Sequence, residues 1–486
     1  MAESQQIAPR SEEEVEAIQP ASGDPDNPFN WPTRTKWTVT LTTCFVCFIV
    51  GLNATGIASA PTPINDRFSI SDASFPNSFW PVASWTIGAA IVPMLVLPLM
   101  EKHGTRIGYI SCYATFFVFV IPQAVAPNFA TLIVCRFISG SAAGVLQNGM
   151  DGIIADIWDG PVQRSLPVTI YVTALLAGVS LGPVYGGVVV HKLYWRWIFY
   201  IQLVIYGVTF IVVLLAMKET RSPVILSKRL REDKQSTDHL STRGGSSPQS
   251  PAKFLYDTLI LPARLLCTEP VVFFFTLLSA LSYGIAFIST QSVTQVFVTN
   301  FAFAEYEAGL VQASIVIGEI LGFIACLFQN TCYARVGRAN PHKTEADISE
   351  VRLYLSIPAS FIGLAGGLFW YGWTSYPSLP WILPAIGLAM TMFGVTVVMQ
   401  AIMMYITDAY AKYAASASAA VCFGENMFAA FLPLAAQSLY NNLGFQWASS
   451  LLGFIALALS FAPILLVWKG KHIRARSPFI EEAKYH

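Results

Sequence analysis

The sequence predicts an all-α membrane protein whose twelve transmembrane helices form two six-helix bundles. Hydrophobic residues make up 54% of the 486 residues and charged residues only 12%, about half the charged fraction of an ordinary soluble domain. A helix needs roughly 20 predominantly apolar residues to cross the hydrocarbon core of a bilayer. The chain contains twelve stretches of that length and character, so most of it is expected to lie within a membrane.

The predicted spans fall into two sets of six, because the longest break between them follows the sixth. In order along the chain they are 37–60, 78–100, 107–127, 130–156, 165–190, 196–217, 270–299, 306–330, 351–374, 379–405, 413–438 and 446–468. The two bundles are therefore predicted to comprise residues 37–217 and 270–468.

Polar segments flank and separate the predicted bundles. Residues 1–36 and 469–486 are predicted to be cytosolic tails, and residues 218–269 a cytosolic linker. The first tail begins with an acidic stretch that is expected to be disordered. The middle of the linker, from Lys228 to Ala252, is rich in serine, glycine and charge, so it is predicted to be mobile and to lack a fold of its own.

The distribution of lysine and arginine predicts that both termini face the cytosol. With that orientation, the basic residues outside the cytosolic segments are Arg67, Arg136, Lys192 and Arg196, out of 29 in the chain. Positively charged loops resist translocation across the membrane, and the opposite orientation would translocate nearly every basic loop. The plasma membrane is the expected location, and the vacuolar membrane is the alternative.

The most specific pattern in the chain is a glycine-rich segment within the fifth span. Gly178, Gly182 and Gly186 recur every four residues, so they share one helix face and let a neighbouring helix approach closely. Pro183 removes a backbone donor and bends the helix, which a membrane tolerates where protein or water covers the freed carbonyl. Gly187 adds a further small residue. The alternative interpretation is ordinary small-residue packing.

This segment resembles the antiporter motif of the major facilitator superfamily, in its drug:proton antiporter branch with twelve spans. The resemblance to fungal members covers nearly the whole chain and includes Asn27-Pro28-Phe29-Asn30-Trp31-Pro32, Ala155-Asp156-Ile157-Trp158, Trp195-Arg196-Trp197 and Tyr440-Asn441-Asn442-Leu443-Gly444. It implies a monomer of the major facilitator fold, in which two bundles related by a pseudo-twofold axis give alternating access to a site near the midplane.

The loop between the second and third spans resembles the superfamily's cytosolic loop motif. Gly104 supplies the permissive backbone that a tight turn needs. Glu101 and Arg106 can pair with each other or with helix ends, which would hold the inner mouth shut in one state. Leu97 stands where the family usually has a glycine, and Thr105 replaces a usual arginine, so the latch is expected to be weaker. Surface positive charge would also explain Arg106.

Arg136 lies in the outer half of the fourth span. An arginine at that depth costs at least a few kcal/mol unless it faces a cavity or a partner. Its match to the family's R-x-x-x-G motif, completed here by Gly140, implies a role in proton coupling, although Ser139 replaces a frequent glutamine. The alternative is a structural arginine satisfied by backbone carbonyls.

Carboxyl groups inside the bilayer are the natural proton carriers, because burial opposes their charged form. Glu319 lies near the middle of the eighth span and Glu425 near the middle of the eleventh. Asp151 lies a little over four helical turns from Arg136, too far for direct pairing on one straight helix. Many family members carry a basic residue at the position of Glu425, so the inverted charge here favours cationic or polyol-rich cargo.

Polar side chains within the first, fourth, seventh and tenth spans are predicted to line a substrate cavity between the bundles. They are Asn53, Gln147, Asn148, Gln291, Gln295, Gln400 and Tyr405. Such groups usually face protein or water inside a membrane, and hydrogen bonding between helices is the alternative.

The residues also limit the class of function. No Ser/His/Asp set, metal cluster or phosphate-binding G-x-x-x-x-G-K-[ST] loop is apparent, so neither an enzyme, a cofactor, a metal nor a nucleic-acid partner is expected. The resemblance implies a proton-coupled transporter that exports an amphipathic organic compound, with the lipid bilayer, the small-molecule cargo and protons as its partners. An importer or facilitator of a native solute is the alternative, and a non-transporting sensor is a second one.

Overall fold

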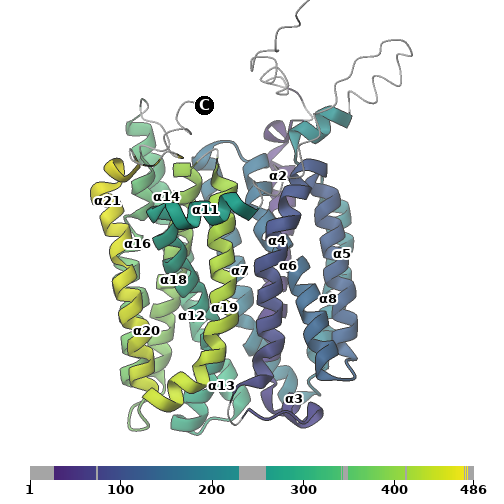
Figure 1. Cartoon of the computed structure of the whole chain (residues 1–486), viewed down its shortest axis with the longest axis vertical. Helices are drawn as coiled ribbons and strands as arrows, with labels where there is room; N and C mark the ends of the chain where they lie inside the picture. Colours follow the sequence, from purple (N-terminus) through teal and green to yellow (C-terminus); the bar gives the residue numbers. More distant parts are fainter. Residues whose placement is uncertain are drawn as a thin grey trace, which may run out of the picture.

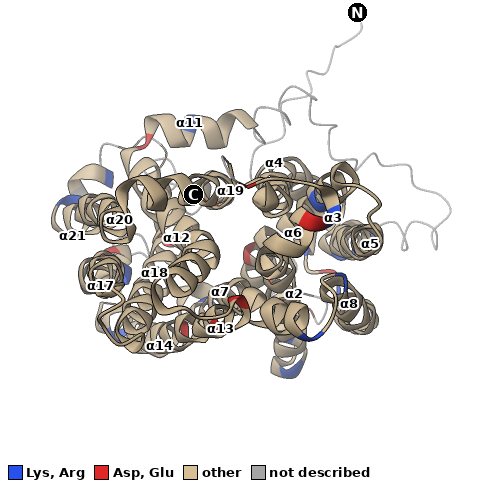
Figure 2. Ribbon diagram, turned by 90° about the horizontal axis from the view of Figure 1, so that it is seen from below, with Lys and Arg blue, Asp and Glu red and all other residues tan. Residues whose placement is uncertain are grey.

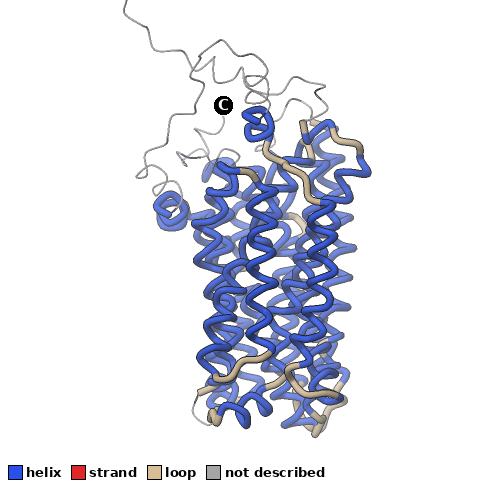
Figure 3. Tube along the Cα trace, turned by 90° about the vertical axis from the view of Figure 1, so that its right-hand side faces the viewer, coloured by secondary structure: helices blue, strands red, loops and turns tan. Residues whose placement is uncertain are grey.

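The computed structural model describes residues 24, 27–72, 75–228, 259–340, 342, 348–410, 413–474, 477 and 479, and within these residues it consists of helices without any strand. Twelve helical segments are long and apolar enough to cross a membrane. They run side by side through the depth of the molecule (Figure 3). The predicted all-α membrane fold with twelve spans is confirmed.

The first six spans form the bundle at the right of Figure 1. Its long helices are α2 (Thr33–Gly56), α4 (Trp80–His103), α5 (Thr105–Ala124), α6 (Phe129–Ile157), α7 (Gly160–Lys192) and α8 (Trp197–Ala216). Four short elements accompany them: η1 (Pro28–Asn30), η2 (Ile57–Ser59), α3 (Pro61–Phe68) and η3 (Asn77–Phe79).

The last six spans form the second bundle, at the left of Figure 1. The seventh and eighth spans are α12 (Pro270–Phe301) and then α13 (Glu305–Val311) with α14 (Ala313–Ala339). The ninth span is assembled from η5 (Ser349–Leu353), α16 (Ser356–Pro358), η6 (Ala359–Ala365) and α17 (Gly366–Thr374). The remaining three are α18 (Ile382–Tyr410), α19 (Ala414–Leu443) and the pair α20 (Phe445–Leu459) and α21 (Phe461–Arg474).

Several helices continue beyond the apolar stretches that predicted them. The predicted span 306–330 ends before α14 does, at Ala339, and the predicted span 379–405 ends before α18 does, at Tyr410. The hydrogen-bond ladder of a helix does not require apolar side chains, so it persists until the chain turns. At the end of α14, the side-chain amide of Asn340 donates a 3.0 Å hydrogen bond to the carbonyl of Val336.

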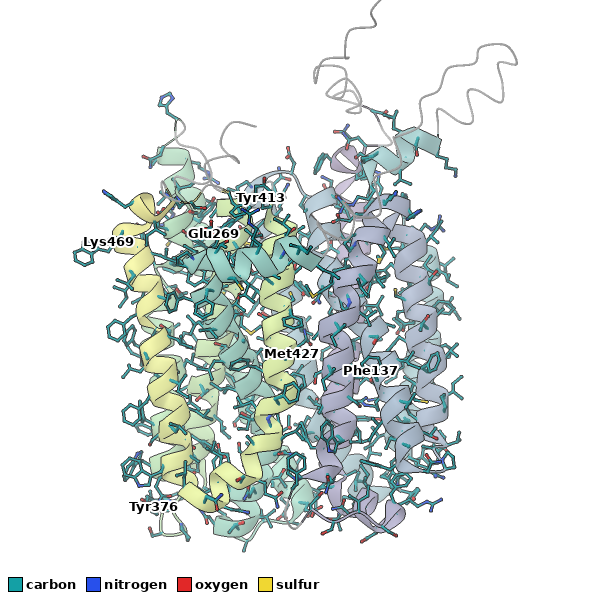
Figure 4. All side chains as sticks on the ribbon, viewed as in Figure 1. Phe137, Glu269, Tyr376, Tyr413, Met427 and Lys469 are labelled. Atoms are coloured by element: carbon teal, nitrogen blue, oxygen red, sulfur yellow. The ribbon has the colours of Figure 1, made fainter. Side chains whose placement is uncertain are left out.

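The chain begins its first span and ends its last span at the same face of the molecule (Figure 1). We call this face, where Thr33 and Arg474 lie, the termini face. The opposite face, where α7 ends at Lys192, is called the distal face. Figure 4 shows Lys469 toward the termini face and Tyr376 at the distal face.

The predicted linker contains a folded segment. Helix α11 (Leu261–Thr268) lies within it and buries Pro262 and Leu265, three residues apart on one helix face, against α12 and α19. The C-terminal end of the predicted linker 218–269 is therefore helical and packed on the second bundle, outside the stretch that was predicted to lack a fold. Apart from Lys228, the stretch predicted to lack a fold lies outside the described residues, as does nearly all of the acidic first tail.

Helix pairing repeats between the two bundles. In the first bundle α2 packs on α7 and α4 on α6, while in the second α12 packs on α19 and α14 on α18. Counted as spans, these pairs are one with five and two with four, then seven with eleven and eight with ten. The second bundle therefore repeats the packing of the first, as a pseudo-twofold axis along the membrane normal requires.

The two bundles meet along two flanks. On one flank α7 contacts α13 and α14, and on the other α4 contacts α19. Figure 2, seen from the distal face, shows α7 beside α13 and α19 beside α4. Helices α12 and α18 also reach α7, and α6 reaches α19. Side chains of these helices therefore face one another across the middle of the molecule.

Candidate functional site

A central cavity lies between the two bundles. It is lined by α6 and α7 from the first bundle and by α12, α18 and α19 from the second. The residues that line it are Gln147, Asn148, Tyr171, Val172, Leu175, Tyr283, Met399, Met403, Cys422, Glu425 and Asn426. Of the residues that the sequence predicted to bind substrate, Gln147 and Asn148 lie here.

Glu425 lies on α19 and is the one charged residue among the described side chains that line this cavity. The hydroxyl of Ser279, on α12, donates a 2.5 Å hydrogen bond to its Oε1. Met427, two residues further along, lies at mid-height of α19 in Figure 4. Asp151 lies one helical turn beyond Gln147 on α6, and its buried Oδ1 has no hydrogen-bond partner among the described residues.

Glu319 lies on α14 at the contact between the bundles and is fully buried. The hydroxyl of Ser180, on α7, donates a 2.6 Å hydrogen bond to its Oε1, and Oε2 has no partner among the described residues. Ser180 belongs to the glycine-rich segment that resembles the antiporter motif. The fold therefore joins two separate sequence predictions, the motif and the buried carboxyl group, in one contact between bundles.

The glycine-rich segment presents two different faces. Gly178, Gly182 and Gly186 all face α2, and a Cβ atom at Gly182 would lie 2.1 Å from the hydroxyl oxygen of Thr55. At Gly178 and Gly186 a Cβ atom would lie 2.2 Å from backbone carbonyl oxygens of α2. These three glycines therefore permit the close packing of α7 on α2 inside the first bundle.

The other face of the segment points to the second bundle. A Cβ atom at Gly187 would lie 3.7 Å from the Cα atom of Tyr306 in α13, an ordinary contact distance. The carbonyl of Pro183 lies beside Gly309 in the same helix. Gly187 and Pro183 thus take part in the contact between bundles rather than in the packing on α2.

Arg136 is fully buried inside the first bundle and uses its donors on neutral oxygen atoms. Its Nε donates to the carbonyl of Pro81 at 2.9 Å, and its Nη2 to the carbonyl of Ala54 at 2.6 Å. Its Nη1 donates to both the backbone carbonyl and the Oδ1 of Asn53, at 2.8 and 3.0 Å. This is the geometry of the structural alternative, and the role in proton coupling stays a prediction.

Asn53 belongs to the same polar network and does not line the cavity. Its Nδ2 donates to Gln202 at 2.9 Å, and its Oδ1 accepts from the indole of Trp85 at 3.0 Å as well as from Arg136. Its side chain is therefore occupied in joining α2 to α4, α6 and α8.

The remaining polar candidates lie outside the cavity lining. Gln400 of α18 donates a 2.5 Å hydrogen bond to the hydroxyl of Thr169 in α7, which links the bundles. Gln295 donates at 2.8 Å to Asn441 of α19, near the distal face. Gln291 is half-buried on the same helix. The ring of Tyr405 packs edge-on against Phe275, with 5.3 Å between centroids.

The loop after α4 is held differently from the predicted pairing. Glu101 pairs with Arg221, which follows α8, at 2.5 Å, and Arg221 also contacts Asp156 at 3.3 Å. Glu219 accepts hydrogen bonds from the backbone N–H groups of Thr105 and Arg106, at 2.9 and 3.2 Å. A carboxylate is stabilised at that place by the helix N-terminus.

In this structure Glu101 therefore pairs with Arg221 rather than with Arg106, and the gate role of Glu101, Gly104 and Arg106 stays a prediction. Gly104 has a φ of 113°, a backbone conformation that favours glycine, as the tight turn required. The charged run after the sixth span, which includes Glu219 and Arg221, was the available signal for this contact.

A second contact at the termini face was missed by the sequence interpretation. Arg352, at the start of the ninth span, is 2% exposed and pairs with Asp408 at 2.9 Å. It also reaches into the first bundle, where it donates to the hydroxyl of Ser165 at 2.8 Å and the carbonyl of Pro161 at 3.2 Å. The local signals were a basic residue at the start of the ninth span and the acidic Asp408 at the predicted cytosolic end of the tenth.

Contacts at the distal face also join the bundles. Thr62 of α3 donates to Glu305 of α13 at 3.1 Å, and the ring of His191 stacks on Tyr306 at 3.9 Å. Gln437 of α19 donates to the carbonyl of Asp72 at 2.9 Å. The central cavity thus lies between contacts at both ends, which is the arrangement expected when the bundles open one face at a time.

Comparisons with known proteins agree with this architecture. The family model for the Major Facilitator Superfamily matches residues 42–423. The MFS transporter paaT of Penicillium rubens is 32% identical over 94% of this chain and 82% of its own length. The efflux pump radE of Floropilus chiversii is 30% identical over 94% of this chain and 84% of its own.

Further relatives extend the same pattern. The efflux pump FUB11 of Gibberella moniliformis is 30% identical over 93% of this chain and 75% of its own length. Among solved structures, the proton:xylose symporter XylE matches with a TM-score of 0.61 at 15% identity, over 90% of this chain and 96% of that one, and so shows the fold. With twelve spans, two repeated bundles and these relatives, the chain belongs to the major facilitator superfamily.

Proposed function

We propose that this protein is a proton-coupled antiporter that exports an amphipathic organic compound through the central cavity. The observation that carries the proposal is the position of two glutamates between the bundles. Glu425 lies in the cavity lining, and Glu319 lies against Ser180 of the antiporter-like segment. Both sites involve helices from each bundle, so a change of charge there acts on the contact that must open and close.

Each glutamate has a neighbour that suits proton exchange. The hydroxyl groups of Ser279 and Ser180 donate hydrogen bonds to Glu425 and Glu319. An unpaired carboxylate is costly to bury, whereas the neutral acid is much less so. Protonation would therefore lower the cost of closing the bundles over the carboxyl group, and deprotonation would favour a state in which water reaches it.

Alternating access gives this chemistry a direction. In the proposed cycle a proton from the outer solution binds a carboxyl group, cargo leaves outwards, and the neutralised protein returns to the state open to the cytosol. In the state open to the cytosol, the contacts of Arg352 with Ser165 and Pro161 would break. In the outward-open state, the contacts of Thr62 and Gly187 with α13 would break instead. The glycine-rich segment would seal the cavity against leak, and Arg136 and Asp151 stay candidates for tuning the coupling.

Two observations favour export over import. The segment 178–187 resembles an antiporter motif, and the names of two relatives, radE and FUB11, are those of efflux pumps. An importer or facilitator is the second candidate because one fold serves both directions. The resemblance and the buried carboxyl groups also favour transport over enzymatic or purely sensory roles.

The first test is efflux from cells that express the chain. The cells are loaded with a panel of fluorescent and radiolabelled amphipathic cations and aromatic metabolites, and efflux is followed with and without a protonophore. We expect efflux of particular compounds that collapses with the proton gradient. Faster uptake of a solute without efflux would instead support the importer.

Substitution of the two glutamates tests the coupling. Glu319→Gln and Glu425→Gln should each abolish the pH dependence of transport, because each removes a titratable group and keeps the size of the side chain. Asp66→Asn, at an exposed position of α3, is the matched control and should transport normally. Normal efflux with unchanged pH dependence in both glutamine variants would contradict the assignment.

Localisation and orientation form part of the proposal. We propose that the termini face lies in the cytosol of a plasma-membrane protein, since most lysine and arginine residues lie on that side of the predicted spans. An epitope at the N-terminus should be reached by antibody only after the cells are permeabilised. Labelling of intact cells would reverse the orientation.

A further inference from the structure

We infer that the cargo of the central cavity is a protonated amine bearing at least one N–H group, and that Glu425 is its counter-ion. The inference rests on the proposed transport function and specifies the class of cargo. It also assigns hydrogen-bonding partners to that cargo: Glu425 and Asn426 on the second bundle and Gln147 on the first. Four features of the cavity carry it.

The first feature is an uncompensated charge. Glu425 is the one charged side chain among the described residues lining the cavity, and its hydrogen bond comes from a neutral hydroxyl of Ser279. Arg136 lies on α6 roughly 16 Å along the helix axis from Gln147, and its donors are used on Pro81, Asn53 and Ala54. A cation in the cavity would neutralise Glu425, whereas an anion would be repelled by it.

The second feature is a pair of buried polar side chains, one of which has an oxygen atom without a partner among the described residues. Asn426 is 4% exposed, and its Oδ1 accepts no hydrogen bond within the described chain, although its Nδ2 donates to the carbonyl of Cys422. Gln147 is 2% exposed, and its side chain interacts with the hydroxyl of Tyr283 on α12 across the cavity. Both residues line the cavity. A buried polar group without a partner is costly, so the bound ligand is expected to supply one.

These groups determine which hydrogen bonds the cargo makes. Glu425 and Asn426 both offer acceptor oxygens on α19, and an ammonium group with N–H bonds can donate to both. Gln147 offers a donor from α6 in the other bundle, which requires an acceptor such as a carbonyl or hydroxyl oxygen on the cargo. The cargo would thus bridge the two bundles, with its amine on the second and its acceptor on the first.

The third feature is the rest of the lining, which suits an apolar body attached to the amine. Tyr171 and Tyr283 supply aromatic faces that attract cations as well as rings. Met399 and Met403 supply flexible, polarisable surface that adapts to varied shapes. An aromatic or alkyl amine therefore fits the lining better than a small inorganic cation does.

The fourth feature couples cargo to protons at one carboxyl group. The titratable groups that interact with Glu425 are Asp151 on α6, Tyr171 on α7, Tyr283 on α12 and Cys422 on α19 itself. None of these groups is basic, and the residues that α18 contributes to the cavity lining, Met399 and Met403, are uncharged. Glu425 can hold either a proton or the ammonium group, so binding of the amine displaces the proton and exchange follows from competition.

The test uses four dansyl probes of similar size with the purified full-length protein in nanodiscs. They are dansylcadaverine, its N-acetyl derivative, the corresponding carboxylic acid, and the trimethylammonium analogue. Fluorescence anisotropy and equilibrium dialysis give the affinity of each. We expect dansylcadaverine to bind at least about tenfold more tightly than the neutral and anionic probes, because of the charge pair, and more tightly than the analogue without N–H.

Variants locate the amine. Glu425→Gln keeps an acceptor for Ser279 and removes the charge, so it should abolish the preference for the amine while Glu425→Asp retains part of it. Asn426→Leu should abolish the preference for N–H over trimethylammonium. Asp66→Asn on α3 is the control and should bind all four probes as the unmodified protein does. Binding should weaken as the pH falls, and amine binding should release protons into weakly buffered solution.

The outcomes separate this inference from the transport proposal. Failure of dansylcadaverine to bind, equal binding of the amine and the acid, or an unchanged preference in Glu425→Gln would overturn the amine assignment. Gradient-driven efflux of neutral or anionic probes alone would leave the antiporter intact and overturn the inference. Selective amine binding without gradient-driven flux of any probe would support the site and contradict the transport proposal.

Discussion

Two pairs of polar side chains, Arg136 with Asn53 inside the first bundle and Glu319 with Gln400 between the bundles, use their polar atoms in opposite ways. Within the first bundle, the guanidinium of Arg136 donates hydrogen bonds to Asn53 and to the carbonyl groups of Pro81 and Ala54. All of its nitrogen atoms therefore have partners. Between the bundles, Glu319 accepts a hydrogen bond at Oε1, and Gln400 donates one from Nε2. The second polar atom of each side chain, Oε2 of Glu319 and Oε1 of Gln400, is buried without a partner in the described residues.

The difference indicates which contacts are permanent and which must break. A saturated buried network is expensive to disrupt, so it holds a bundle together as one body. A contact that has a single hydrogen bond and an unpartnered polar atom costs little free energy to break, because water can hydrogen-bond to both groups. The two faces of α7 show this contrast within one helix, since Gly182 packs tightly on α2 and Gly187 contacts α13 at ordinary distance.

The largest effect is expected for Arg136→Leu. Loss of the guanidinium removes four hydrogen bonds to buried oxygen atoms of α2 and α4, at about 1 kcal/mol each, so the variant should lose about 3 kcal/mol or more of stability. Thermal unfolding of the detergent-purified protein and the yield of monodisperse material measure this. A variant that stays stable and loses only its proton coupling would instead support the role of Arg136 in proton coupling.

A smaller loss is expected for Gly182→Ala, with Gly187→Ala as the matched control in the same helix. The added methyl group at 182 would lie 2.1 Å from Thr55 and 3.0 Å from the backbone nitrogen of Gly56, so α7 must shift away from α2. Overpacking of this kind costs about 1–3 kcal/mol. Gly187→Ala should unfold at the unmodified temperature, and equal losses in both variants would remove the contrast between the two faces.

The smallest change in stability is expected for Ser165→Ala, which weakens a contact between the bundles. Arg352 would lose one hydrogen bond and keep Asp408 and the carbonyl of Pro161. Loss of about 1 kcal/mol from the closed state should raise the population open at the termini face about fivefold. Cys422 is the one cysteine among the described residues that line the cavity. A maleimide applied from the termini face should label Cys422 about fivefold faster in Ser165→Ala than in the unmodified protein.

The converse result would be informative. An unchanged labelling rate in Ser165→Ala would mean that the Arg352 contact does not limit opening. A large fall in thermal stability in the same variant would place this contact among the permanent ones, and the distinction between the two regions would then fail at the termini face.

Sequence patterns predicted the elements of the fold and only part of the site. The spans followed from composition, because a bilayer selects for long apolar helices whatever surrounds them. Glu319 and Ser180 were both visible as residues, yet nothing local indicated that they touch across the bundles. Arg221 and Arg352 were overlooked because their partners lie far along the chain or in the other bundle.

The sequence by itself determined that this chain is a membrane protein of twelve helices and which family it resembles. Those properties depend on local composition and on short motifs such as Gly178 to Gly187. Only the tertiary structure decided how the polar residues are used: Asn53 and Arg136 inside one bundle, Glu319 at the interface, and Glu425 in the cavity. The reason is physical, since a buried polar group is defined by the partner it finds, and that partner comes from a distant part of the chain.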